Sequence, residues 1–263
     1  MLGFFRKSPS PDPDSVDEDA IETRAASIGD DKRVYAIGDI HGRADLLIDL
    51  LRRIDDNDAD CIPCPTELIL LGDLIDRGPQ SCQVVDHALK LARAGVPIRF
   101  IKGNHEEIFV EAARGDVASV RFFCRIGGEQ TLLSYGLSAA DYAKMKAEDI
   151  GQWMLANIPR AHVDFLDSFS DMIEMGDYVF VHAGVRPGVA LNAQNSQDLH
   201  WIRGDFLKCP DPFDKVVIHG HTITQEVDEH PNRIGIDTGA YLSGRLTAIG
   251  LQGDEHWFLS TAD

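Results

Sequence analysis

The segment VYAIGDIHG, residues 34–42, joins a short apolar run to a group of polar residues and glycines. The run has the length and composition of a buried strand, so Gly38-Asp39-Ile40-His41-Gly42 should begin where that strand ends. Asp39 and His41 are two residues apart, and an extended backbone would point both side chains to the same side. A carboxylate and an imidazole suit Mn, Fe or Zn better than Ca or Mg, so the pair could chelate one such ion.

Four further apolar runs end in the same way. The polar segments that follow them are GDLIDRG (72–78), GNHE (103–106), HAG (182–184) and HGHT (219–222). Apolar residues at helical spacing lie between the first three runs, at 44–55 and 81–94. Strands that alternate with helices predict an α/β sheet with crossover connections, so the polar segments should gather at the carboxyl ends of its strands.

The second and third segments add oxygen ligands to the first. Asp73 stands at its strand end as Asp39 does, so parallel neighbouring strands would bring the two carboxylates together. One carboxylate can bridge two ions, and dinuclear hydrolytic sites hold their ions ~3.5–4 Å apart. Asn104 offers a neutral carbonyl oxygen, while His105 stays free to transfer a proton. Each residue alone would more often be structural, but the repeated combination of strand, glycine and ligand favours a two-metal centre.

Taken in order, the five segments resemble the bacterial type of the phosphoprotein phosphatase branch of the calcineurin-like metallophosphoesterases. The similarity extends to GGEQTL (127–132), WIR (201–203) and DTGA (237–240). It implies a two-sheet α/β/α sandwich with the site at the strand ends. It also implies two divalent metal ions as cofactors, with Mn²⁺ preferred and Fe or Zn as alternatives.

The resemblance assigns six residues to the metal ions. The first ion is expected to be held by Asp39, His41 and Asp73, and the second by Asp73, Asn104, His182 and His221. Asp73 would bridge the two ions. His219, two residues before His221, is interpreted as a packed strand residue and not as a ligand.

Four more residues are expected to take part in catalysis. The resemblance implies that His105, oriented by Asp76, is the general acid. It also implies that Arg77 and Arg203 hold the phosphoryl oxygens. A metal-bridging hydroxide would attack phosphorus directly, and the ions and guanidinium groups would offset charge on the equatorial oxygens.

The sequence therefore predicts a dinuclear-metal-dependent phosphomonoester hydrolase, namely a serine/threonine protein phosphatase that could also accept phosphotyrosine. The alternative is a symmetric bis(5'-nucleosyl)-tetraphosphatase, whose branch has similar metal motifs. That branch tends to lack the acidic residue before the arginine of the second segment and to read GNHD in the third, whereas this chain has Asp76 and Glu106. A non-catalytic binding module with the same fold is a remote alternative, because no ligand or acid is missing.

Two positions depart from the family pattern. Ile126 stands where related bacterial sequences usually place Asn before Gly-Gly, and His200 stands where an apolar residue usually precedes Trp201. Both are expected beside the substrate groove, so they bear on specificity and not on the reaction.

Composition limits the partners. The formal net charge of −18 argues against nucleic acid, because surfaces that bind its backbone need basic patches. Bound cations can still reverse the local field for a phosphate group. We expect a phosphoprotein or a small phosphoester as substrate, no membrane partner because no segment has a transmembrane helix's length, and a cytoplasmic location because the N-terminus does not read as a secretory signal.

The chain is expected to form one catalytic domain over residues 33–263. Residues 1–32 are rich in Pro, Ser, Asp and Glu without an apolar period, and they predict a disordered or loosely docked acidic tail. Residues 116–175 lack the strand endings and are interpreted as a helical insertion. Residues 233–259 carry short apolar runs spaced by Gly-rich turns, which predicts an antiparallel meander.

Overall fold

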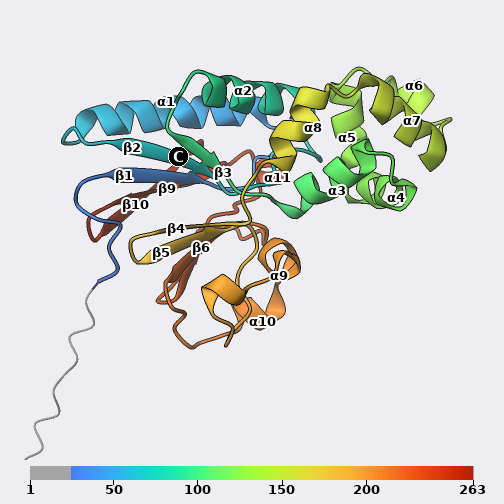
Figure 1. The fold of residues 1–263 in the computed structure, drawn as a ribbon. Coiled ribbons are helices and arrows are strands. Elements are labelled where there is room, and N and C mark those ends of the chain that lie inside the picture. The colour runs from blue at the N-terminus through green and yellow to red at the C-terminus, as the bar shows by residue number, and fades with distance from the viewer. Residues whose placement is uncertain (1–24, 263) are drawn as a thin grey trace, which may run out of the picture.

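The computed structural model describes residues 25–262, so most of the expected tail, residues 1–24, lies outside the described residues. Two five-stranded sheets pack face to face, and helices cover their outer sides (Figure 1). Apolar side chains fill the space between the sheets, among them Val34, Phe180 and Ile218. The predicted α/β/α sandwich is confirmed.

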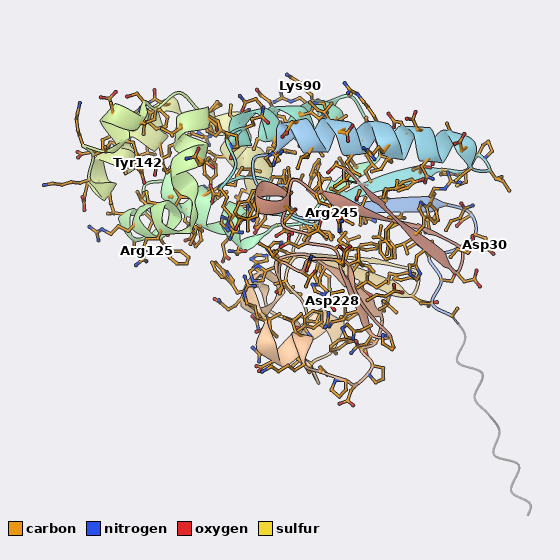
Figure 2. All side chains as sticks on the ribbon, turned by 180° about the vertical axis from the view of Figure 1, so that it is seen from behind. Asp30, Lys90, Arg125, Tyr142, Asp228 and Arg245 are labelled. Atoms are coloured by element: carbon orange, nitrogen blue, oxygen red, sulfur yellow. The ribbon has the colours of Figure 1, made fainter. Side chains whose placement is uncertain are left out.

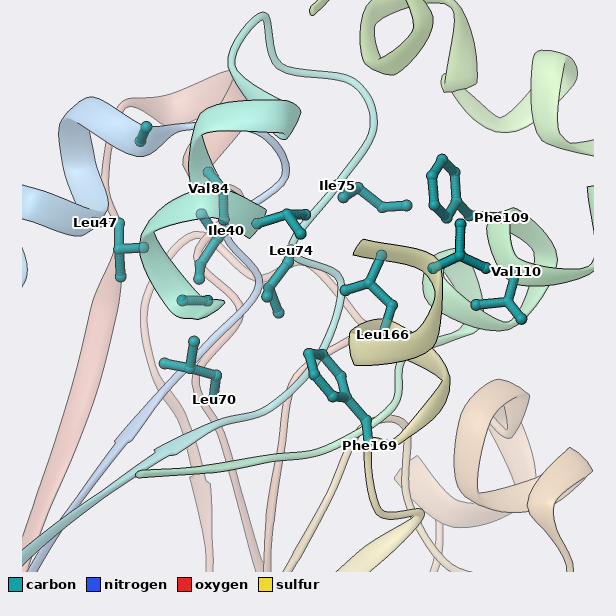
Figure 3. Close-up of a cluster of buried hydrophobic side chains, with 14 of the residues drawn as sticks. Ile40, Leu47, Leu70, Leu74, Ile75, Val84, Phe109, Val110, Leu166 and Phe169 are labelled. Atoms are coloured by element: carbon teal, nitrogen blue, oxygen red, sulfur yellow. The ribbon is translucent and has the colours of Figure 1, made fainter. Parts of the chain in front are cut away.

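The first sheet carries the first three strand endings. Its strands, in spatial order, are β10 (Glu255–Ser260), β9 (Thr247–Gln252), β1 (Arg33–Ile37), β2 (Thr66–Leu70) and β3 (Ile98–Phe100). β1, β2 and β3 are parallel, and β9 and β10 are antiparallel additions. The crossovers are the predicted helices, α1 (Ala44–Asp60) and α2 (Ser81–Arg93). Their apolar faces pack with side chains from the strand ends, as Leu47 and Val84 do beside Ile40 (Figure 3).

The second sheet carries the last two strand endings. Its order is β4 (Met172–Met175), β5 (Tyr178–Val181), β6 (Val216–His219), β8 (Arg233–Gly235) and β7 (Asp228–His230). α9 (Ser196–Trp201), α10 (Gly204–Leu207) and the short 3₁₀ helix Leu191–Ala193 follow β5. The expected meander over 233–259 is wrong, because β8 belongs to this sheet whereas β9 and β10 belong to the first. Between them the chain crosses the strand ends through α11 (Ala240–Ser243), so the glycines there mark a crossing and not hairpin turns.

A group of helices extends from one side of the sandwich (Figure 1). They are α3 (Asn104–Ala113), α4 (Val117–Ile126), α5 (Gly128–Ser134), α6 (Ala139–Tyr142), α7 (Ala147–Asn157) and α8 (Arg160–Asp167). Phe109, Leu166 and Phe169 join this group to the core between the first sheet and its helices α1 and α2 (Figure 3). Charged side chains such as Lys90 on α2 and Arg125 on α4 project outward (Figure 2).

The packed chain begins before β1. Ile28 is buried and its N–H donates to the Gly253 carbonyl at 2.9 Å, while the Ser27 N–H donates to Asp177 Oδ2 at 2.9 Å. Residues 25–32 therefore lie against both sheets. Within residues 25–262, no helix has both the length and the apolar character needed to cross a membrane.

Candidate metal centre

The ends of strands from both sheets converge on one buried site, and the backbone there is unusual. Among residues 25–262, five non-glycine residues have positive φ. They are His41 (44°), Asp73 (50°), Asp76 (71°), Arg77 (67°) and His221 (64°). Side chains disfavour this conformation, and such strain gathers at functional sites. All five are predicted site residues.

Asp39 and His41 lie close together, but not because alternate side chains of an extended backbone point to the same side. The backbone at His41 is left-handed and not extended, so the expectation of an extended segment is wrong. The His41 N–H donates to the Asp73 carbonyl at 2.9 Å, which ties this loop to the second segment. His41 Nε2 lies 4.0 Å from Asp39 Oδ2 as a result.

Asp73 stands at the centre of the potential ligands. Its Oδ2 lies 3.5 Å from His41 Nε2, 3.4 Å from His182 Nε2 and 3.8 Å from His105 Nε2. On the second-sheet side, His182 Nε2 lies 3.0 Å from both Asn104 Oδ1 and His221 Nδ1. Two compact donor groups thus share Asp73, one with His41 and His105 and one with His182 and His221.

The hydrogen bonds of the imidazoles fit a divalent metal ion. His41 Nδ1 donates to the Ile75 carbonyl at 2.8 Å, and His182 Nδ1 donates to the Leu71 carbonyl at 2.9 Å. Each ring is therefore oriented with its Nε2 toward Asp73, as in a histidine that ligates a metal ion through Nε2. His221 Nε2 is buried without any partner. The donor set of carboxylate, imidazole and amide oxygen suits a transition-metal ion.

Glycines make room for the carboxylates. A Cβ on Gly103 would collide with Asp73 Oδ1, and one on Gly220 would collide with Asp39 Oδ1. The His221 N–H donates to both Asp39 oxygens at 3.1 Å, so Asp39 links the first loop to the last. The glycines of the predicted motifs are needed for these close approaches.

Burial and the Asp73 carboxylate together set the charges of the histidines. It lowers the pKa of His221 to about 2 and lowers that of His41 well below its usual value, so both rings are neutral as metal ligands must be. Burial also acts to lower the pKa of His182, but the Asp73 carboxylate raises it to about 10. Burial opposes ionisation of Asp73 too, and His182 and His105 outweigh it to hold that pKa well below its usual range. The centre therefore favours positive charge beside Asp73.

The expected acid is held by its expected partner. His105 Nδ1 donates to Asp76 Oδ2 at 2.6 Å, and the Thr131 hydroxyl donates to Asp76 Oδ1 at 2.6 Å. Burial acts to lower the pKa of His105, but the carboxylates of Asp73 and Asp76 raise it above its usual value. The ring can therefore carry the proton that a leaving group needs.

Arg77 spans the two rings that border the first donor group. Its Nη1 donates to His41 Nε2 at 2.8 Å and its Nη2 donates to His105 Nε2 at 2.9 Å. A ring nitrogen cannot accept from Arg77 and also hold an ion or a proton. Binding of an ion at His41, or protonation of His105, would therefore break that hydrogen bond of Arg77 and leave its N–H groups available to phosphoryl oxygens.

Three residues that support the centre were given no role in it from the sequence, namely Glu106, Gly127 and Thr131. Glu106 is fully buried, and its carboxylate accepts the N–H groups of Asp73 (2.7 Å), Leu74 (2.8 Å) and Gly103 (3.0 Å). The Gly127 carbonyl accepts the Arg77 N–H at 3.1 Å. Gly127 and Thr131 give the GGEQTL motif a structural role, because they hold Arg77 and Asp76. The resemblance to the family had assigned no role to this motif.

Three residues singled out in the sequence lie apart from the donor groups. Arg203 is exposed and donates to the Thr222 hydroxyl at 3.1 Å. His200 does not line an open groove, because it is 2% exposed and its ring lies between Glu107 (3.2 Å) and Asp171 (3.0 Å). His219 is buried against Phe206, outside both donor groups.

This fold and this centre define a metal-dependent phosphoester hydrolase. Residues 32–240 match the family described as calcineurin-like phosphoesterase, and the chain belongs to that family. Divalent ions, when bound, would supply activation of water and neutralisation of phosphoryl charge. The carboxylate of Asp73, which belongs to both donor groups, could hold such ions, and the Asp76 carboxylate orients the His105 ring.

Individual relatives add detail. The chain is 27% identical over 239 residues to the bis(5'-nucleosyl)-tetraphosphatase PrpE [asymmetrical] of Anoxybacillus flavithermus, covering 81% of this chain and 88% of that relative. It is 39% identical over 82 residues to the symmetrical bis(5'-nucleosyl)-tetraphosphatase of Paracidovorax citrulli, covering 31% and 26%. A crystal structure of a protein assigned as a diadenosine tetraphosphatase superposes with a TM-score of 0.60 at 20% identity, covering 90% and 98%, which shows likeness of fold.

Tyr241 offers a test of how Arg77 is held. Its ring lies 5.0 Å from the guanidinium carbon of Arg77 and packs edge-on against His41 at 5.3 Å. Such a cation–π contact is worth ~0.5–1 kcal/mol at an accessible site, so Tyr241→Ala should raise KM about two- to fivefold with less change in kcat. Steady-state kinetics on any accepted phosphoester measures this split. Tyr241→Phe keeps the ring and should resemble the wild type, and equal effects of the two substitutions would contradict this role.

Proposed function

We propose that the chain hydrolyses bis(5'-nucleosyl) tetraphosphates and cleaves them asymmetrically. The observation that carries the proposal is the similarity to the asymmetrical enzyme of Anoxybacillus flavithermus, which spans 81% of this chain and 88% of that relative. Identity to a symmetrical enzyme over a comparable span is lower, at 24% over 82% of this chain for that of Janthinobacterium sp., and the 39% identity to that of Paracidovorax citrulli spans 31% of this chain. This preference puts hydrolysis of dinucleotide tetraphosphates ahead of the protein phosphatase predicted from the motifs, and it differs from the predicted alternative, which was the symmetric enzyme.

The edge of the centre supports a nucleotide substrate. Leu242 is 70% exposed on α11, beside Tyr241, and Ile223 is 40% exposed on the loop that carries Thr222. Gly239, which precedes α11, is in close contact with Ile223, so the two loops adjoin. Apolar and aromatic side chains near phosphate-binding arginines suit the flat faces of a nucleobase.

The residue roles that we propose follow the sequence assignment. Asp39, His41 and Asp73 would hold one ion, and Asp73, Asn104, His182 and His221 would hold the other, with Mn²⁺ as the first metal to test. Arg77 and Arg203 would bind separate phosphates of the polyphosphate chain. Water adds to one phosphorus as a P–O–P bond breaks, so diadenosine tetraphosphate would give ATP and AMP. Symmetric cleavage would give two ADP.

Protein phosphatase activity is the second candidate. It is favoured by the 2.6 Å bond from His105 to Asp76, because an alkoxide leaving group needs a well-placed acid more than a phosphate leaving group does. A phosphopeptide would then occupy the same centre.

A direct comparison of substrates tests the proposal. The full-length protein loaded with Mn²⁺ should hydrolyse diadenosine tetraphosphate with a kcat/KM well above that for phosphoserine or phosphotyrosine peptides. Anion-exchange chromatography of the products should show ATP and AMP. Asp73→Asn protein from the same purification is the control for contaminating activity. Faster turnover of phosphopeptides would reject the proposal, and two ADP would reject asymmetric cleavage alone.

A further inference from the structure

Asp237 occupies in the second sheet the position that Asp39 occupies in the first. Asp39 follows β1 after Gly38, and Asp237 follows β8 after Ile236. A Cβ on Gly38 would lie 2.6 Å from the Ile236 carbonyl oxygen, so the two backbones are in contact at the strand ends. The two aspartates therefore leave adjoining strand ends and enter the same buried region.

Only one of the two oxygen atoms of the Asp237 carboxylate has a hydrogen-bond partner. Oδ1 accepts the Gly239 N–H at 2.9 Å. Oδ2 is buried without a hydrogen-bond partner, in a residue that is 1% exposed. Within residues 25–262, His221 Nε2 is the other such atom, and His221 is a member of one of the donor groups. A buried carboxylate oxygen without a partner is costly unless it has a counter-charge.

The surroundings of Asp237 are those of the metal centre. Burial raises its pKa to about 6, and its carboxylate is close enough to Asp73, His182 and Arg77 to interact with their charges. After burial, it is also the main cause of the raised pKa of Asp39. Two buried carboxylates side by side repel each other, and a cation between them removes that repulsion.

We propose that Asp237 is a third carboxylate of the metal centre, which stabilises the ion beside Asp39 through its free Oδ2. Asp237 is absent from both compact donor groups, so it acts from just outside the ligands. Outer partners of this kind typically change metal affinity ~10- to 100-fold. The geometry that carries the proposal is the unpartnered Oδ2 and the contact of the two strand ends.

Metal binding and thermal stability of Asp237→Asn test the proposal without any substrate. Calorimetric titration of the full-length protein with Mn²⁺ should show that one of its two ions binds ~10- to 100-fold more weakly than in the wild type. The metal-free protein should keep or raise its Tm, because a buried unpaired charge is removed while an amide oxygen still accepts the Gly239 N–H. The gain in Tm on adding Mn²⁺ should shrink.

Thr238→Val is the matched control. The Thr238 hydroxyl is buried and bonds Thr247 and the Arg245 carbonyl, so this substitution disturbs the same loop without touching a potential ligand. It should leave Mn²⁺ affinity unchanged. Wild-type Mn²⁺ affinity in Asp237→Asn would overturn the proposal, as would a lower metal-free Tm with an unchanged metal-induced gain. Because no substrate is present, the outcome is separate from that of the proposed function.

Discussion

Replacing Asp73 by asparagine is expected to lower kcat by at least ~10³-fold and to leave fewer than two ions on each chain. Metal catalysis is worth several kcal/mol, and each ~1.4 kcal/mol is tenfold in rate. Asp73 belongs to both donor groups, and its Oδ2 lies within 4 Å of Nε2 of His41, His105 and His182, so the substitution removes the negative charge that the two groups share. Metal analysis after dialysis and turnover of the best substrate measure the two effects.

The substitution should spare the fold. Asparagine keeps an oxygen that can accept the His105 N–H, as Asp73 Oδ1 does at 3.1 Å, and circular dichroism should show a folded protein. Asp45→Asn is the control, because Asp45 is an exposed carboxylate paired with Arg43 at 2.7 Å and is no part of the centre. Retention of two ions by Asp73→Asn would show that Asp73 is not the shared ligand.

The motifs were sufficient to predict that the site residues meet. Parallel strands end at one edge, so residues such as Asp39 and Asp73 had to come together once the strands were recognised. His182 and His221 follow parallel strands of the second sheet in the same way. The prediction relied on apolar runs that end in glycine and a polar residue, and such runs are recognisable within a few residues of sequence.

Contacts between distant segments could not be predicted in this way. Thr131 hydrogen-bonds Asp76 across 55 residues, and Asp237 comes near enough to Asp39 to raise its pKa because the ends of two different sheets meet at Gly38 and Ile236. Neither pairing has a spacing rule. The split of residues 233–259 between the sheets has the same origin, since a strand pattern does not say which sheet a strand joins.

The substrate was the hardest feature to predict, and Glu106 shows why. Glu106 in GNHE favoured a protein phosphatase over the symmetric dinucleotide branch. Its carboxylate is buried and holds three backbone N–H groups of the Asp73 loop. A residue in that position supports the metal centre and does not contact a substrate, so it carries little information about which phosphoester is cleaved.

His105→Asn is expected to lower kcat by ~10²–10⁴-fold on phosphoserine peptides and to leave the metal content unchanged. The structure makes the second half of this expectation a strict test, because His105 Nε2 lies 3.8 Å from Asp73 Oδ2 and belongs to one of the compact donor groups. Loss of an ion in this variant would show that His105 is a ligand and not the acid. Turnover and metal analysis of the same preparation decide between the two roles.

The size of the loss should depend on the leaving group. A serine alkoxide is strongly basic and must be protonated as it departs, whereas a nucleotide departs as a weakly basic phosphate anion. His105→Asn should therefore cost less on diadenosine tetraphosphate than on a phosphoserine peptide. Asp76→Asn leaves the imidazole in place but weakens the 2.6 Å bond that orients it, so its losses should follow the same order and be smaller. Equal losses on both substrates would mean that His105 acts on a step common to them, such as binding the phosphoryl group, and not as the acid for the leaving group.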